Sequence, residues 1–146
     1  MENQRSSERE PAQWELMTNE QDTVDLQSFL TRIGQEGTTG SNGMLLRRAG
    51  KPIGFIMFDL VKQDDKNILF IPDLEVEESE RSAGVTSKLI TAVREYAHQV
   101  HATHIGWTSA TEIMDRISSK LDPEESGGNY LLPIAKLDRG TLAGRI

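Results

Sequence analysis

The chain has 146 residues, 27% of them charged and 36% hydrophobic, which suits one globular domain with a single core. The net charge of -7 argues against non-specific nucleic-acid binding, because such binding depends on Lys and Arg facing phosphates. The lack of cysteine excludes disulfides and thiolate sites, and no apolar run is long enough to span a membrane.

Both ends of the chain are polar. Residues 1–11 contain nothing that would pack into a core, so we predict a disordered arm or one that a partner holds in place. This arm has no apolar stretch of the kind found in signal peptides, and we therefore expect a cytoplasmic protein. Residues 138–146 are expected to form a frayed tail, which leaves residues 12–137 as the folded domain.

The first half predicts a strand, a helix and then three strands joined by tight turns. Trp14 and Leu16 alternate with polar residues in the first strand. Asn19 and Asp22 have the spacing of a reciprocal cap at the start of a helix, and Gly34 suits its end. The predicted strands of this half cover residues 13–18, 44–48, 53–61 and 68–77.

The second half predicts two helices, each followed by a strand. The first helix carries an apolar stripe, and a crossover of this length should bring the next strand parallel to strand 68–77. Pro72 lies inside that earlier strand and cannot donate a hydrogen bond, so it predicts a bulge or a local separation. The elements of this half are a helix over 85–102, a strand over 103–108, a helix over 109–121 and a strand over 130–137. The fold class is therefore α/β (α+β), with a mixed, mostly antiparallel sheet of about six strands flanked by about three helices.

Residues 73–90, DLEVEESERSAGVTSKLI, lead from the end of a strand through a short loop into the long helix. The first turn of a helix presents backbone N–H groups that have no partner within the helix, and such groups bind phosphate. Gly84 would let a ligand approach the backbone closely. The stretch therefore predicts a phosphate-binding loop.

This order of elements, with LEVEESERSAGVTSKLI at residues 74–90, resembles the GNAT N-acetyltransferase superfamily. The family pattern is a strand that ends in an apolar–x–Val step, then Arg/Gln-x-x-Gly-x-Gly/Ala, then a helix. Arg81, Gly84 and Thr86 occupy the three signature positions, and Thr86 departs from the usual Gly or Ala. The match in architecture extends over most of the predicted domain, whereas the match in residues is confined to its centre.

The resemblance implies that acetyl-coenzyme A is the cosubstrate. Its pyrophosphate would bind the backbone of the loop and of the first helical turn, with Lys88 adding charge. Its pantetheine arm would pair with Val76 in the gap that Pro72 opens. The implied cofactor-binding residues are Leu74, Val76, Arg81, Ser82, Ala83, Gly84, Val85, Thr86 and Ser87.

Acetyl transfer to an amine needs a base, and the strand before the loop carries three carboxylates. Asp73, Glu75 and Glu77 alternate with apolar residues and so share one face. A carboxylate beside an apolar cleft would have its pKa raised towards a useful range. We select Glu75 by its position, with the Val76 amide polarising the thioester carbonyl.

The acid that protonates the departing thiolate is harder to find. The resemblance implies a tyrosine on the helix after the fifth strand, ahead of Gly-Phe, but this chain has Ile117 or Ser118 there and then Asp122-Pro123. Ser118, acting through water, and Tyr130 in the last strand are the remaining candidates. We expect no metal, because the three histidines have no evident carboxylate partner in the sequence.

The resemblance therefore implies transfer of an acetyl group from acetyl-coenzyme A to a primary amine of a small molecule, peptide or protein. The missing tyrosine leaves an alternative open, in which a catalytically degenerate GNAT-fold protein serves as a structural or partner-binding component of a larger assembly such as a viral particle. The protein would then be virion-associated instead of cytoplasmic. A homo-oligomer or larger assembly is compatible with either hypothesis, and we expect no nucleic-acid or membrane partner.

Overall fold

The computed structural model describes residues 11–81, 83–108, 114 and 121–142. Its regular elements in chain order are β1 (Gln13–Leu16), α2 (Glu20–Ile33), β2 (Asn42–Arg48), β3 (Lys51–Gln63), β4 (Lys66–Val76), the short 3-10 helix η1 (Glu78–Glu80), α3 (Ala83–Gln99), β5 (His104–Thr108), β6 (Glu124–Ser126), β7 (Asn129–Pro133) and α5 (Ile134–Leu142).

The strands form one sheet of seven in the order β1-β2-β3-β4-β5-β7-β6. Neighbouring strands run antiparallel except β4 and β5, which are parallel and joined through α3. The predicted α+β class, the mixed, mostly antiparallel sheet and the parallel pairing of β5 with β4 are confirmed. The sheet has one strand more than the six that the sequence predicts, because no local pattern predicts β6.

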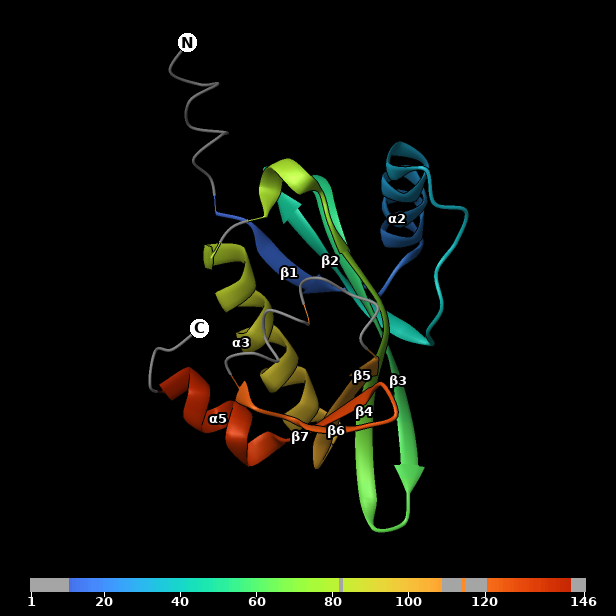
Figure 1. Ribbon diagram of the computed structural model, residues 1–146. Helices are drawn as coiled ribbons and strands as arrows, with labels where there is room; N and C mark the ends of the chain where they lie inside the picture. The colour runs from blue at the N-terminus through green and yellow to red at the C-terminus, as the bar shows by residue number, and fades with distance from the viewer. Residues whose placement is uncertain (1–10, 82, 109–113, 115–120, 143–146) are drawn as a thin grey trace.

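The helices cover the two faces of the sheet unequally. Figure 1 shows α3 and α5 side by side on one face and α2 on the other. The larger core cluster lies between the sheet and α3, with Trp107, Phe58 and Leu89 almost fully buried within it. A smaller cluster under α2 is centred on Phe29 and Phe55, whose rings meet edge to face at 6.0 Å. The face that carries α2 is therefore only partly covered.

Pro72 changes the course of β4. The pairing with β3 shifts there, since Asp73 lies opposite Met57 whereas Phe70 lies opposite Asp59. Before the shift Leu69 and Ile71 belong to the core under α3, and after it Leu74 and Val76 do. The pairing of β4 with β5 also ends at Ile71 and Trp107. The predicted bulge and separation at Pro72 are both confirmed.

The first helix begins and ends as its sequence predicts. The Asn19 side chain accepts a hydrogen bond from the Asp22 amide at 3.0 Å, and the Asp22 carboxylate accepts one from the Asn19 amide at 3.3 Å. Gly34 closes the helix in the left-handed region at φ 78°. These caps fix where the following loop leaves α2.

The predicted strand over residues 130–137 is wrong in its second half, because the chain becomes helical at Ile134. Ile134 and Leu137 are buried and three residues apart, which is helical spacing, and α5 packs against α3. The His98 imidazole meets the Asp138 carboxylate across this contact at 3.0 Å. The predicted helix over 109–121 lies outside the described residues except at its buried Met114 and Leu121.

An ion-pair network centred on Arg47 joins the first three elements. Its guanidinium bonds the carboxylates of Glu15 in β1 at 2.8 Å and of Asp22 and Asp25 in α2 at 2.8 and 2.7 Å. The Thr18 amide, with Arg47 and the Asn19 amide, lowers the pKa of Asp22 despite its burial. Arg47 is the main cause of the lowered pKa of Asp25.

Acid should weaken the fold through this network. The pKa values of Asp22 and Asp25 lie lower in the folded chain than their ordinary value of 3.8, so the folded state binds fewer protons than the unfolded state does. Their contribution is present above that value and is lost as the pH falls through the folded pKa values. We expect the urea midpoint to drop between about pH 6 and about pH 3. The drop should be smaller in Asp22→Asn and Asp25→Asn than in Asp65→Asn, which alters an exposed turn.

Candidate functional site

At the end of β4, beyond the point where β5 turns away, none of the described strands pairs with the outer edge. The Glu77 amide donates to the Ile53 carbonyl at 2.8 Å, and Glu75 lies opposite Phe55. Backbone polar groups alternate along a strand, so those of Val76 point away from β3 and into the gap beyond Pro72. A backbone edge of this kind can pair with an extended ligand.

Arg81 closes part of this edge from within the chain. Its Nε donates to the Val76 carbonyl at 2.9 Å, and a terminal nitrogen lies 3.5 Å from the Glu75 carboxylate. The Arg81 side chain, at the first of the three positions of the family pattern, therefore folds back onto β4. The Lys88 ammonium donates to the Ala12 carbonyl beside β1 at 3.0 Å, and its contribution of charge at the loop stays a prediction.

The start of α3 lies directly after this edge in the chain. Figure 1 shows β4 leading through η1 into α3, which then runs back along the sheet. Gly84 is exposed in the first turn, while Val85 is buried and anchors the turn on the core. Thr86 and Ser87 are half-buried, and Ser87 lines a groove between β1 and α3. The positive end of a 17-residue helix thus follows the open strand edge.

Asp73 is the carboxylate with the clearest perturbation in the gap. Burial raises its pKa above the ordinary value of 3.8, and the Gln35 side chain together with the Thr39 and Leu74 amides opposes that rise. The Gln35 amide nitrogen donates to Asp73 at 3.1 Å and to the Gly37 carbonyl at 2.8 Å. The loop after α2 therefore lies against the first residue of β4 beyond the bulge.

The other two carboxylates of the strand make ion pairs. Glu75 is 40% exposed and lies close to Arg81, while Glu77 bonds Arg32 of α2 at 3.1 Å. The register places Asp73 opposite Met57 and Glu75 opposite Phe55, so both share the face of the sheet that carries α2. This agrees with the predicted shared face and separates the two carboxylates from Leu74 and Val76.

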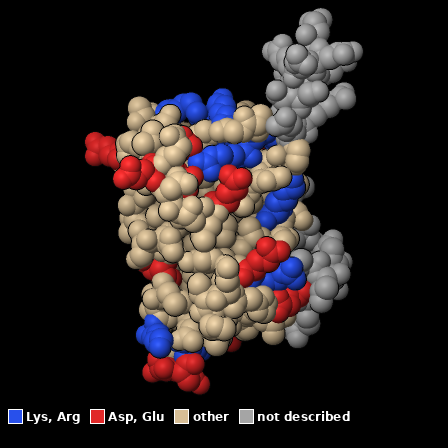
Figure 2. All heavy atoms as spheres, turned by 180° about the vertical axis from the view of Figure 1, so that it is seen from behind, with Lys and Arg blue, Asp and Glu red and all other residues tan. Residues whose placement is uncertain are grey.

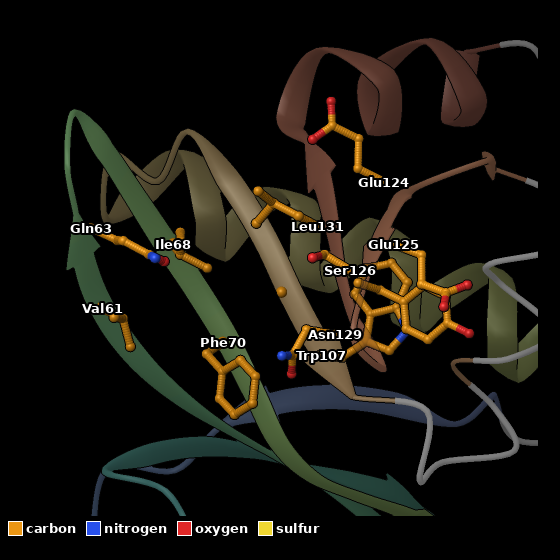
Figure 3. A pocket seen from close by; sticks show the side chains of 12 residues that line it. Val61, Gln63, Ile68, Phe70, Trp107, Glu124, Glu125, Ser126, Asn129 and Leu131 are labelled. Carbon is orange, nitrogen blue, oxygen red and sulfur yellow. The ribbon is translucent and has the colours of Figure 1, made fainter.

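A hollow of about 460 Å³ lies beside the gap. Figure 3 shows side chains from β3, β4, β6 and β7 around it, with Phe70 and Trp107 at one end. Tyr130 also lines it, and its ring stacks on Trp107 with the ring centres 5.6 Å apart. Tyr130 therefore lies at the edge of the gap, whereas Ser118 lies outside the described residues.

The sequence model of the acetyltransferase (GNAT) family matches residues 5–116, more than two thirds of the chain. The chain belongs to the GNAT family. A search of curated proteins found no match. Among the described residues no helix combines the length and apolar character of a membrane span.

Solved structures support the GNAT fold at low sequence identity. YhbS, a GNAT family N-acetyltransferase from Escherichia coli in complex with CoA, is 15% identical with a TM-score of 0.60, covering 91% of this chain and 85% of its own. An N-acetyltransferase from Staphylococcus aureus Mu50 is 9% identical with a TM-score of 0.62, covering 86% and 99%. The aminoglycoside acetyltransferase HMB0005 from a soil metagenomic sample is 16% identical with a TM-score of 0.63, covering 80% and 93%.

The structure brings together some of the predicted site residues of this GNAT protein and leaves others apart. Leu74, Val76, Arg81 and Glu75 meet at the gap. Ser82 lies outside the described residues, and the Ser87 side chain faces β1.

The sequence gives no signal for the hollow or for the contact between Gln35 and Asp73, because their residues come from segments far apart in the chain.

Figure 2 shows that Lys and Arg side chains on the face it presents lie beside Asp and Glu and form no continuous basic surface.

Proposed function

We propose that this GNAT protein transfers an acyl group from acetyl-coenzyme A to a primary amine. One observation carries the proposal: β4 parts from β5 at Pro72, and the Val76 edge, which no described strand pairs with, comes directly before the positive end of α3. A pantetheine arm would lie along this edge and the pyrophosphate would lie at the helix end. YhbS, whose fold is similar, binds CoA, and this supports the choice of cofactor.

The proposed cofactor contacts follow from the backbone. Val76 and Leu74 would pair with the pantetheine amides, and the first turn of α3 with its preceding loop would hold the pyrophosphate. Arg81 must give up its hydrogen bond to the Val76 carbonyl for the pantetheine to take that acceptor. The proposed backbone and side-chain contacts are Leu74, Val76, Arg81, Ser82, Ala83, Gly84, Val85, Thr86 and Ser87.

The reaction needs two proton movements around one bond exchange. The amine nitrogen attacks the thioester carbonyl, a C–N bond forms, the C–S bond breaks, and the products are an amide and a thiol. The amine proton leaves to a base, and the thiolate gains a proton. We propose Asp73 as the base in place of Glu75, because burial raises its pKa whereas Glu75 lies against Arg81. Tyr130 beside the gap is the described candidate for the acid.

Calorimetric titration tests the cofactor site directly. Acetyl-coenzyme A should bind with a micromolar Kd, and acetyl-pantetheine, which lacks the pyrophosphate, should bind at least about tenfold more weakly. Equal affinities would contradict the role of the α3 end. If acetyl-coenzyme A does not bind, the acyltransferase proposal fails, and the structural or partner-binding alternative becomes the better hypothesis.

Asp73→Asn should lower kcat about a hundredfold and remove the acidic limb of the pH profile. A base must be deprotonated, so kcat/KM should rise with pH through the pKa of Asp73, which lies above its ordinary 3.8. Glu75→Gln is the matched control on the same face of β4 and should keep that limb. The opposite result, with the limb lost only in Glu75→Gln, would restore Glu75 as the base.

A further inference from the structure

One side of the hollow is formed by residues on the face of the sheet opposite α3. Val61 pairs with Ile68, and Phe70 pairs with Gly106, so their side chains share one face. None of these residues belongs to the core cluster under α3, whereas Leu69, which lies between Ile68 and Phe70 in the chain, does belong to it. The apolar wall of the hollow therefore shares its face with Asp73, whereas Trp107 and Tyr130, which also line the hollow, belong to the packing under α3.

The wall and floor of the hollow are apolar. Val61, Ile68 and Phe70 form the wall, and Gly106 forms the floor beside Ile68 and Phe70. A Cβ at Gly106 would lie 3.0 Å from the Ile68 Cγ2 and 3.5 Å from the Phe70 Cδ1. The depth of the hollow thus depends on this glycine.

The rim of the hollow is acidic. Figure 3 shows Glu124 and Glu125 on β6 across from Gln63 on β3, with Asn129 at the start of β7. All twelve lining residues belong to the described part of the chain, and none of them is Lys, Arg or His. Glu124 lies opposite Leu131, which in turn lies opposite Gly106, so Glu124 shares the face of the apolar wall, whereas Glu125 lies opposite Tyr130 and points to the other face. A carboxylate without a lining cation attracts a positively charged ligand.

The hollow reaches the gap in the sheet at one end. Phe70 and Trp107 line the hollow, and the β4–β5 pairing ends one residue beyond Phe70, at Ile71 and Trp107. A ligand that fills the hollow would therefore present one end to the place where Asp73 lies and where the proposed thioester would arrive from the other side.

We propose that this hollow is the acceptor site and that it selects a small organic amine with an apolar body. The inference rests on the proposed acetyl transfer and names the substrate class of that reaction. A volume of about 460 Å³ accommodates one small molecule. The apolar wall would leave the hydroxyls of a sugar amine without partners, and this disfavours such acceptors.

Binding measurements on the full chain test the proposal with four probes: hexylamine, hexanol, glucosamine and a tripeptide with a free N-terminus. Hexylamine should bind best, and hexanol, which lacks the charge, about tenfold more weakly. The double variant Glu124→Gln/Glu125→Gln should lose about tenfold in hexylamine affinity. Glu20→Gln/Glu95→Gln removes two exposed carboxylates elsewhere and should lose none.

Gly106→Val should fill the floor of the hollow and abolish hexylamine binding, while acetyl-coenzyme A still binds. Gly106→Ala is a smaller change and should weaken hexylamine binding. The alanine variant keeps the test usable if the valine variant does not fold. Hexylamine binding that survives all of these variants would overturn the inference, as would tighter binding of glucosamine or the tripeptide. If acetyl-coenzyme A binds and hexylamine does not, only the inference fails. If hexylamine binds and acetyl-coenzyme A does not, the proposed function fails and the acceptor role fails with it.

Discussion

Gly84→Glu should abolish acetyl-coenzyme A binding without unfolding the chain. The residue is exposed in the first turn of α3, where the proposed pyrophosphate would lie, and a carboxylate there would repel the phosphates and occupy their space. We expect affinity to fall at least about a hundredfold in a calorimetric titration. Stability should hold or rise slightly, because Glu favours helices more than Gly and suits a helix N-terminus.

Thr23→Glu is the control for this variant. It places the same charge in the first turn of α2, on a helix that is not proposed to bind the cofactor. Cofactor affinity should be unchanged in Thr23→Glu. If both variants lose affinity equally, the effect is one of net charge, and α3 is not the phosphate site.

Arg47→Met should cost the fold about 2–3 kcal/mol of unfolding free energy. The side chain is 15% exposed and holds three carboxylates from β1 and α2, of which Asp22 is itself only 10% exposed. Its loss leaves that carboxylate buried without its cation, and this penalty exceeds the worth of an ordinary surface pair. Urea unfolding at neutral pH measures the change.

Two further variants separate charge from geometry in this network. Arg47→Lys keeps the charge but cannot span the carboxylates with a planar fork, so it should recover only part of the loss. Adding Asp22→Asn and Asp25→Asn to Arg47→Met should restore some stability, because only the more exposed Glu15 carboxylate then lacks the Arg47 cation. A triple variant less stable than Arg47→Met would contradict this account.

Local sequence signals predicted the fold well where a single residue type has a single physical consequence. Asn19 with Asp22, and Gly34, marked the ends of α2 because caps require these side chains and this φ value. Pro72 marked the bulge because it lacks an N–H. The parallel pairing of β5 followed from the long connection through α3.

The signals failed where burial, not local pattern, decides the structure. β6 is short, polar and exposed, so nothing in Glu124–Ser126 indicates a strand without β7 beside it. The sequence predicts a strand at Ile134 and Leu137, because their spacing of three indicates a helix only once α3 is there to pack against.

The candidate site also has one part that the sequence predicts and one part that depends on the fold. The stretch that carries Arg81 and Gly84 was predicted from the sequence, since a contiguous loop and helix end form it. The choice among Asp73, Glu75 and Glu77 could not be made, because their environments depend on Gln35, Arg81 and Arg32 from other parts of the fold.

The bulge at Pro72 also means that β4 contains one residue more than strict alternation of its two faces would need. Leu69 and Ile71 face the α3 core on odd positions, and Leu74 and Val76 do so on even ones. Deleting a single residue between these pairs would remove the bulge and leave Leu69, Ile71, Leu74 and Val76 in strict alternation, with all four still facing the α3 core. A single-codon deletion at Pro72 would therefore keep the two faces of the strand and lose the bulge at which β4 separates from β5 beside the candidate site.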